Sequence, residues 1–182
     1  LTRHERMVPD RPAEATGASS TAWLDTVPED GNFCLWVHLY DTHAAYNPPP
    51  PYRDKERDDL YSGEIAYMDA HIGALLGHAA LRDENQPIIS IMGDHGESLG
   101  EHGEQTHGVL VYDSTMHVPW ILRVPGGPEG IRMALPVSQV DLVPTILGSV
   151  GVKAPLEADG LDLMSILADD EIAGGVLRRR SI

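Results

Sequence analysis

The sequence has 182 residues, a hydrophobic fraction of 42% and a formal net charge of −15. These values fit one globular domain of ordinary size and argue against a disordered chain. So acidic a chain repels nucleic acid and anionic membranes, so we expect neither as a partner, and no apolar run approaches the roughly 18 residues of a membrane span.

The first half of the chain predicts a linker, a strand, a loop and a helix. Residues 1–31 are rich in Pro, Ala, Ser, Thr and charge, which predicts a linker with one short helix around Ala22–Leu24. The apolar, aromatic run Phe33–Tyr40 is typical of a buried strand. The prolines of Pro48–Pro51 predict an extended loop, and the three- and four-residue apolar period of Tyr61–Arg82 predicts an amphipathic helix.

The second half predicts two strands and two helices. The strands are expected at Pro87–Gly93 and Val118–Gly126, and the helices at Val140–Val150, with Ser138 as N-cap, and Leu161–Leu167. The strand at Phe33–Tyr40, the helix of Tyr61–Arg82 and the strand at Pro87–Gly93 predict a βαβ unit with parallel strands. The fold class is therefore α/β, with a domain at residues 32–170 and a tail at residues 171–182.

A candidate metal site follows the strand at Pro87–Gly93. Asp94 and His95 come directly after it, and carboxylate oxygen and imidazole nitrogen are both good ligands of divalent cations. Gly96 then allows a sharp turn. Two ligands do not complete a site, so others must come from elsewhere. The alternative is an ordinary surface turn.

The same loop carries further polar side chains. His107 precedes an apolar run, so its side chain can point back at the sheet edge. There it can donate a hydrogen bond, or lend positive charge, to a substrate oxygen. His102 lies between it and the metal pair. The loop's glutamates, Glu97, Glu101 and Glu104, either orient these imidazoles or are simply solvated.

The earlier loop offers His43, which lies just beyond the end of the strand at Phe33–Tyr40, with Asp41 placed to orient it. Because sites in α/β sheets form beyond the carboxyl ends of strands, both histidine-bearing loops are expected at one sheet edge. Inside the strand, His38 is interpreted as a core histidine and Cys34 as an inert buried thiol.

Three segments, taken in order, resemble the sulfatase family. They are FCLWVHLYDTHAAYNPPPPY, YSGEIAYMDAHIGALL and IISIMGDHGESLGEHGEQTHGVLVYDSTMHVPWILRVPG, followed by QVDLVPTIL and DGLDL. The resemblance runs from about Phe33 to Leu167. It implies an alkaline-phosphatase-like layered fold with a mostly parallel sheet flanked by helices, and a hydrolase that cleaves sulfate monoesters of small molecules or glycans.

The resemblance also assigns roles residue by residue. Asp94 and His95 match ligands of a divalent metal, typically calcium, with manganese or zinc in some relatives. His43 and His107 match residues that contact the sulfate group. The formylglycine nucleophile, made from a Cys or Ser in a C/S-x-P-x-R motif, has no counterpart in this sequence, and neither has an early Asp-Asp pair of metal ligands.

We therefore expect the downstream part of a split active site, with the missing N-terminal half of the same protein as its partner and little activity by itself. Three alternatives stay open: a phosphodiester or phosphonate hydrolase, a phosphoethanolamine transferase, and a non-catalytic metal-binding remnant. A periplasmic or extracellular location is slightly favoured over a cytoplasmic one.

Overall fold

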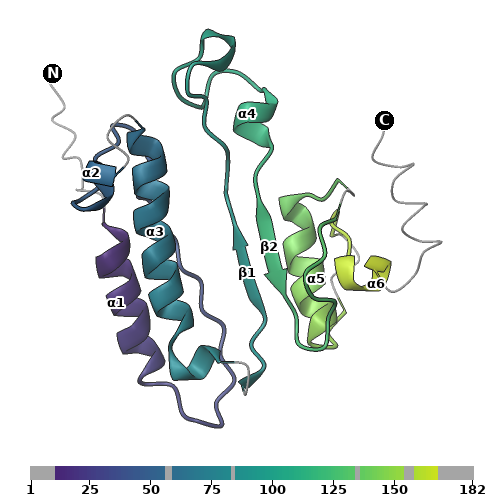
Figure 1. Cartoon of the computed structure of the whole chain (residues 1–182). Helices are drawn as coiled ribbons and strands as arrows, with labels where there is room; N and C mark the ends of the chain where they lie inside the picture. Colours follow the sequence, from purple (N-terminus) through teal and green to yellow (C-terminus); the bar gives the residue numbers. More distant parts are fainter. Residues whose placement is uncertain (1–10, 56–58, 83–84, 134–135, 154–157, 168–182) are drawn as a thin grey trace, which may run out of the picture. The chain divides into compact units, whose positions relative to one another are not determined.

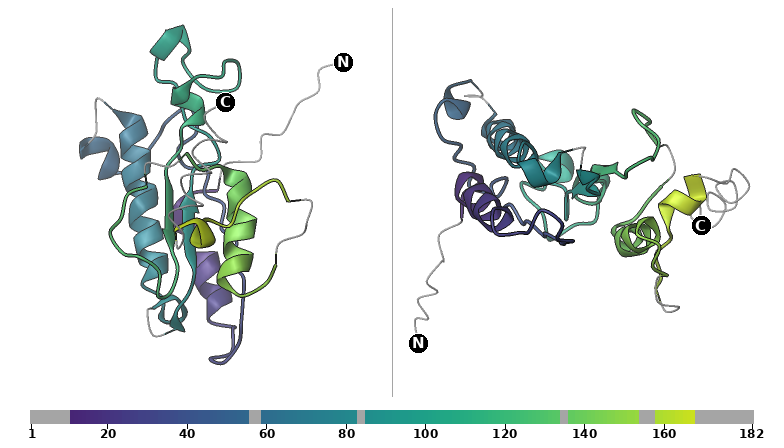
Figure 2. Two further views of the ribbon diagram at one scale, coloured as in Figure 1. Left: turned by 90° about the vertical axis from the view of Figure 1, so that its right-hand side faces the viewer. Right: turned by 90° about the horizontal axis from the view of Figure 1, so that it is seen from below.

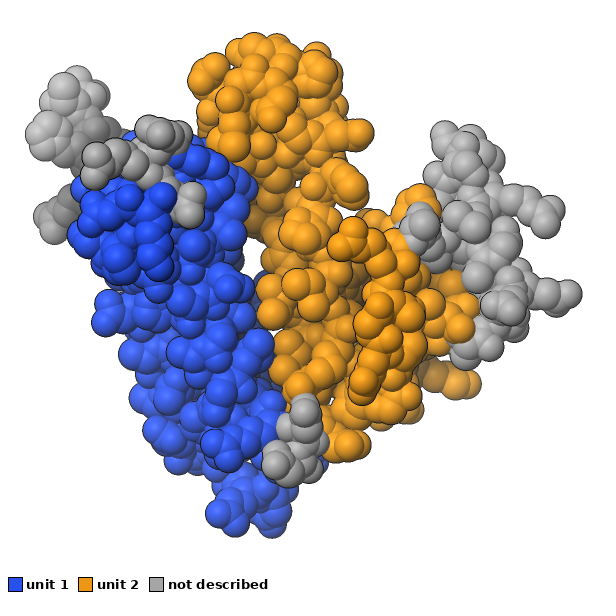
Figure 3. Space-filling model, viewed as in Figure 1, with its two compact units in different colours: residues 1–85 blue, residues 86–182 orange. Residues whose placement is uncertain are grey.

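The computed structural model describes residues 11–55, 59–82, 85–133, 136–153 and 158–167. The chain divides into two compact units, residues 1–85 and residues 86–182 (Figure 3). No helix among the described residues is long and apolar enough to cross a membrane.

Two parallel helices, α1 (Ala13–Leu24) and α3 (Leu60–Leu76), dominate the first unit, which also contains α2 (Tyr52–Lys55) and the 3-10 turn η1 (Ala79–Leu81). The helices α1 and α3 lie side by side (Figures 1 and 2). They run in the same direction, because the start of α1 contacts the middle of α3 and its end contacts the residues after α3. The first contact is from the Glu14 N–H to the Tyr67 hydroxyl, 3.3 Å away, and the second joins Asp25 to His78 at 3.1 Å.

Helix α1 is 12 residues long, so the short helix predicted around Ala22–Leu24 is too small. The missed part lacks apolar periodicity. Its buried positions are mostly small side chains, Ala13 and Ser20, which allow another helix to approach closely. Helix α3 confirms the helix predicted within Tyr61–Arg82.

The predicted strand at Phe33–Tyr40 is extended but joins no β-ladder among the described residues. It returns along α1: Phe33 packs edge-on against Trp23 at 5.8 Å, and Asp41, just after the segment, accepts a hydrogen bond from the Ala13 N–H at 2.9 Å. Its side chains alternate between half-buried and exposed. The prediction of a fully buried strand is therefore wrong: one face is covered and the other is open.

In the second unit, β1 (Ile89–Met92) and β2 (Trp120–Arg123) confirm the two predicted strands and pair antiparallel. Ile89 faces Arg123, and Met92 faces Trp120. The parallel βαβ unit predicted from the strand at Phe33–Tyr40, the helix of Tyr61–Arg82 and the strand at Pro87–Gly93 is not found among the described residues, because Phe33–Tyr40 joins no β-ladder there. The layered parallel sheet stays a prediction.

The remaining elements of the second unit are η3 (Glu101–Gly103), α4 (Asp113–Met116), η4 (Gln139–Asp141), α5 (Leu142–Ser149) and α6 (Leu163–Leu167). Ser138 begins η4 with a capping box, as the sequence predicts for the start of this helical region. Asp141 and Thr145 are fully buried and bind the backbone around the start of α6: Asp141 accepts from the Leu161 N–H and Thr145 from the Leu163 N–H. These two polar side chains fix α6 against α5.

Candidate metal and oxyanion site

Asp94 and His95 lie at the point where the chain leaves β1. The His95 N–H donates to Asp94 Oδ1 at 3.0 Å, and His95 Nδ1–H donates to the Gly96 carbonyl at 2.9 Å. A carbonyl oxygen only accepts, so the neutral ring carries its proton on Nδ1 and presents Nε2 as the lone-pair nitrogen. Asp94 Oδ2 lies 3.9 Å from this Nε2, and both side chains are largely exposed.

This arrangement fits a shared divalent cation. Ligand atoms lie about 2.0–2.3 Å from zinc and about 2.3–2.6 Å from calcium, so two atoms roughly 4 Å apart can bind the same ion. The donor set, one carboxylate and one imidazole with a fixed tautomer, suits such an ion. Among the residues that the structure describes, no group of three or more His, Cys, Asp and Glu side chains converges as a metal site.

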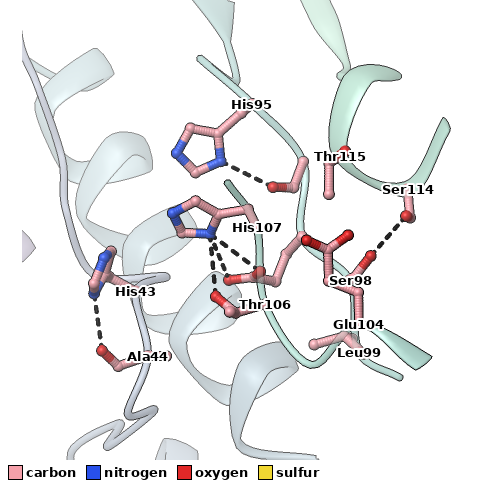
Figure 4. A network of polar contacts seen from close by, with 12 residues as sticks. His43, Ala44, His95, Ser98, Leu99, Glu104, Thr106, His107, Ser114 and Thr115 are labelled. Atoms are coloured by element: carbon pink, nitrogen blue, oxygen red, sulfur yellow. Dashed lines mark hydrogen bonds and ion pairs between the residues drawn. The ribbon is translucent and has the colours of Figure 1, made fainter. Parts of the chain in front are cut away.

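Gly96 holds the metal pair's loop close to α4. Its N–H donates to the Thr115 carbonyl at 2.8 Å, and a Cβ atom at this position would overlap the Ser114 carbonyl oxygen. The buried Ser98 adds a hydroxyl contact to Ser114 at 2.8 Å (Figure 4). The sequence correctly singled out Gly96, but the reason is this close backbone approach rather than a special turn angle.

His107 lies against His95, with ring centroids 4.0 Å apart (Figure 4). Its Nδ1 donates to the Glu97 carboxylate, whose oxygens lie 3.1 and 3.2 Å away. The Glu97 side chain is only 4% exposed. Of the two readings open for Glu97, the structure therefore confirms the one in which it orients an imidazole.

The other loop glutamates have local roles. Buried Glu104 accepts hydrogen bonds through Oε1 from Val109 and Leu110, at 3.2 and 3.1 Å, so it braces the backbone that follows His107. Glu101 is exposed and accepts from the Leu99 N–H at 2.7 Å, a bond that lowers the pKa of its carboxyl.

His102 does not join the His95–His107 pair. It stacks on Tyr112 with centroids 3.9 Å apart, in a positive-φ conformation.

His43 belongs to the first unit, whereas His95 and His107 belong to the second. Its Nδ1 donates to the Ala44 carbonyl at 2.8 Å, and its ring stacks on Tyr40 at 4.6 Å. The loop is held by Glu64, which accepts from the Asn47 N–H at 2.6 Å.

Three predictions about this first-unit segment need correction. Asp41 was expected to orient His43, but it binds the N-terminus of α1 instead. The residue that supports the His43 ring is Tyr40, which the sequence did not indicate. His38 and Cys34 are exposed, so the interpretations as a core histidine and a buried thiol are wrong. Both lie on the open face of the extended segment.

The sulfatase family model matches residues 13–152. Arylsulfatase K of Xenopus laevis is 29% identical over 168 residues, covering 85% of this chain and 31% of the relative. Arylsulfatase K of Danio rerio is 32% identical over 168 residues, covering 85% of this chain and 32% of the relative. The chain thus spans about a third of the length of these curated relatives.

A solved structure supports the same fold. The phosphonate monoester hydrolase SpPMH from Silicibacter pomeroyi matches with a TM-score of 0.69 and 24% identity, covering 86% of this chain and 42% of that one. Because the family model covers most of the chain, including β1, the Asp94–Gly108 loop and β2, the chain belongs to the sulfatase family.

Proposed function

We propose that this chain supplies the metal pair and the sulfate-contacting histidines of a hydrolase that cleaves sulfate monoesters. The observation that carries the proposal is the strand-end pair: Asp94 Oδ2 and His95 Nε2 lie 3.9 Å apart, with His107 packed on the His95 ring. Family membership and the two arylsulfatase K relatives support the reaction class. Calcium is the ion that we expect, with manganese or zinc as the alternatives.

In this proposal Asp94 and His95 hold the divalent ion, which when bound adds positive charge that polarises a sulfate oxygen and favours the ionised nucleophile. The Nδ1–H bond of His95 to the Gly96 carbonyl keeps Nε2 available as a ligand. The net charge of −15 makes such a local positive centre necessary for an anionic substrate.

His107 and His43 would contact the substrate. Both rings donate through Nδ1 to an acceptor of the protein, Glu97 for His107 and the Ala44 carbonyl for His43. Nε2 is then the edge that can face the substrate. In the protonated ring this nitrogen donates a hydrogen bond to a sulfate oxygen or to the departing ester oxygen, on which negative charge grows in the transition state.

The nucleophile would come from a segment outside this sequence, which has no C/S-x-P-x-R motif. Its oxygen bonds to sulfur while the bond from sulfur to the ester oxygen breaks, and the alcohol leaves with a proton. We propose a formylglycine hydrate for this role and a small sulfate ester or a sulfated glycan as substrate. The segment predicted as a linker, residues 1–31, contains α1, which packs against α3, and the tail predicted at residues 171–182 lies outside the described residues.

The main competing function is phosphonate or phosphodiester hydrolysis on the same scaffold, because SpPMH, a phosphonate monoester hydrolase, has a similar fold. The test is a comparison of 4-nitrophenyl sulfate with 4-nitrophenyl esters of phosphate and phenylphosphonate, using the full-length protein. A kcat/KM at least tenfold higher for the sulfate supports the proposal. A preference for the phosphonate ester would assign the site to phosphoryl chemistry.

His107→Ala tests the role of the histidine separately. We expect full metal content with kcat lowered by roughly 10²–10³, the usual cost of removing one oxyanion donor. Loss of metal in this variant would make His107 a ligand instead.

A further inference from the structure

Gln139 holds the backbone at the candidate metal pair from 45 residues away along the chain. Its Nε2 donates to the Gly93 carbonyl at 2.9 Å and to the Asp94 carbonyl at 2.7 Å. Both partners are carbonyl oxygens, which only accept hydrogen bonds, so the NH₂ end of the amide must face them. One side chain therefore binds the two peptide groups that flank Asp94.

Gln139 is itself firmly placed. It is the first residue of η4, between Ser138 and Asp141, whose backbone and side-chain groups bond reciprocally in a capping box. Asp141 is fully buried and also accepts from the Leu161 N–H at 2.9 Å. The backbone of Gln139 thus belongs to η4, which the buried Asp141 anchors directly ahead of α5, although the Gln139 side chain is exposed.

These two bonds restrict the rotations that aim the Asp94 side chain. The Gly93 carbonyl belongs to the peptide plane before the Asp94 Cα, and the Asp94 carbonyl belongs to the plane after it. Fixing both planes fixes φ and ψ of Asp94, and with them the direction of its Cα–Cβ bond. It also fixes the peptide that carries the His95 N–H, which bonds to Asp94 Oδ1.

We propose that Gln139 is a positioning residue that holds Asp94 and His95 in the geometry needed to bind a divalent cation. This inference rests on the proposed function, in which these two residues are metal ligands. Outer partners that orient ligands typically change metal affinity by 10–100-fold when they are removed. Gln139 acts through the ligands' backbone and contributes no donor to the ion.

The test measures Mn²⁺ affinity by electron paramagnetic resonance in the full-length protein, without any activity assay. Gln139→Met has nearly the same length but no donors, and we expect its Mn²⁺ affinity to fall about 10–100-fold. Gln139→Glu also lacks the donors and would repel both carbonyls, so its affinity should fall at least as much. A role as a mere surface group predicts the opposite for Glu, because its added negative charge attracts cations.

Ser138→Ala is the matched control. It removes the hydroxyl half of the capping box but keeps the 2.8 Å bond from the residue 138 N–H to Asp141, so η4 stays anchored and Gln139 keeps its place; the thermal midpoint should fall while Mn²⁺ affinity stays near that of the wild type. Wild-type affinity in Gln139→Met, tighter binding in Gln139→Glu, or an equal loss in the control would overturn the inference. If both Gln139→Met and Asp94→Ala bind Mn²⁺ like the wild type, the inference and the proposed function fail together. If Asp94→Ala loses the metal and Gln139→Met keeps it, only the inference about Gln139 fails.

Discussion

The contact between Glu97 and His107 gives the sharpest test of how the loop supports catalysis. Glu97→Gln keeps the size of the side chain but removes its charge and one of its two acceptor oxygens. In the wild type the Nδ1–H of His107 faces both carboxylate oxygens, 3.1 and 3.2 Å away, and the Glu97 side chain is only 4% exposed. The substitution therefore replaces a shielded, charge-assisted hydrogen bond with a neutral one.

The magnitude follows from the strength of such bonds. A hydrogen bond to a charged group contributes about 1.5–3 kcal/mol and a neutral one about 0.5–1.5 kcal/mol, so the variant loses roughly 1–2 kcal/mol of orientation and charge stabilisation. At about 1.4 kcal/mol for each factor of ten, kcat should fall about 5–30-fold. The KM should change little if the bond matters mainly as charge grows on the departing oxygen.

The assay compares steady-state kinetics with metal content in the full-length protein. Glu101→Gln is the control, because this glutamate belongs to the same loop but is exposed and its carboxylate accepts from the Leu99 N–H rather than from an imidazole. We expect near-normal kcat for the control and stoichiometric metal in both variants. Wild-type kcat in Glu97→Gln, or a loss of metal from it, would refute the reasoning.

Further predictions concern folding of the same chain. Gly96→Ala should lower the free energy of unfolding in urea by about 1–3 kcal/mol, because the added Cβ meets the Ser114 carbonyl. The control Gly73→Ala adds a Cβ in open space on α3 and should be neutral or stabilising. Equal effects of the two substitutions would contradict the close approach at Gly96. Thr145→Val should lower the free energy of unfolding by about 1–3 kcal/mol, because it leaves the N–H of Leu163, the first residue of α6, without its acceptor. An unchanged urea midpoint would argue against this link. Burial raises the pKa of the Tyr67 hydroxyl in the folded protein. Its contribution to the free energy of unfolding is therefore complete below the pKa of the unfolded chain, about 10, and is lost as the pH rises through the pKa of the folded protein. Urea midpoints from pH 8 to 11 should therefore fall more steeply for the wild type than for Tyr67→Phe, and parallel curves would contradict this assignment.

Much of the candidate site could be predicted from the sequence, because its residues are close together along the chain. The apolar run of β1 ends at Asp94, and the ligand types, the following glycine and the nearby His107 are all visible in the printed residues. The helix α3 was equally clear, because its apolar side chains recur with a helical period. In each case the pattern that carries the information is short and continuous.

The errors arose where distant residues decide the structure. Nothing local shows that Asp41 binds the start of α1 while Tyr40 supports His43. The apolar run Phe33–Tyr40 predicts a strand covered on both faces, but burial depends on what other segments bring to it, and here only alternate side chains are covered. Gln139 likewise reaches Gly93 across 46 residues, a contact that no spacing rule encodes.

The most direct test of the account is the metal content of Asp94→Ala in the full-length protein, measured by inductively coupled plasma mass spectrometry beside sulfate ester turnover. The account predicts that bound divalent metal and turnover are lost together, while a Glu101→Gln control keeps both. Retained stoichiometric metal with near-normal turnover would contradict the assignment of Asp94 and His95 as metal ligands.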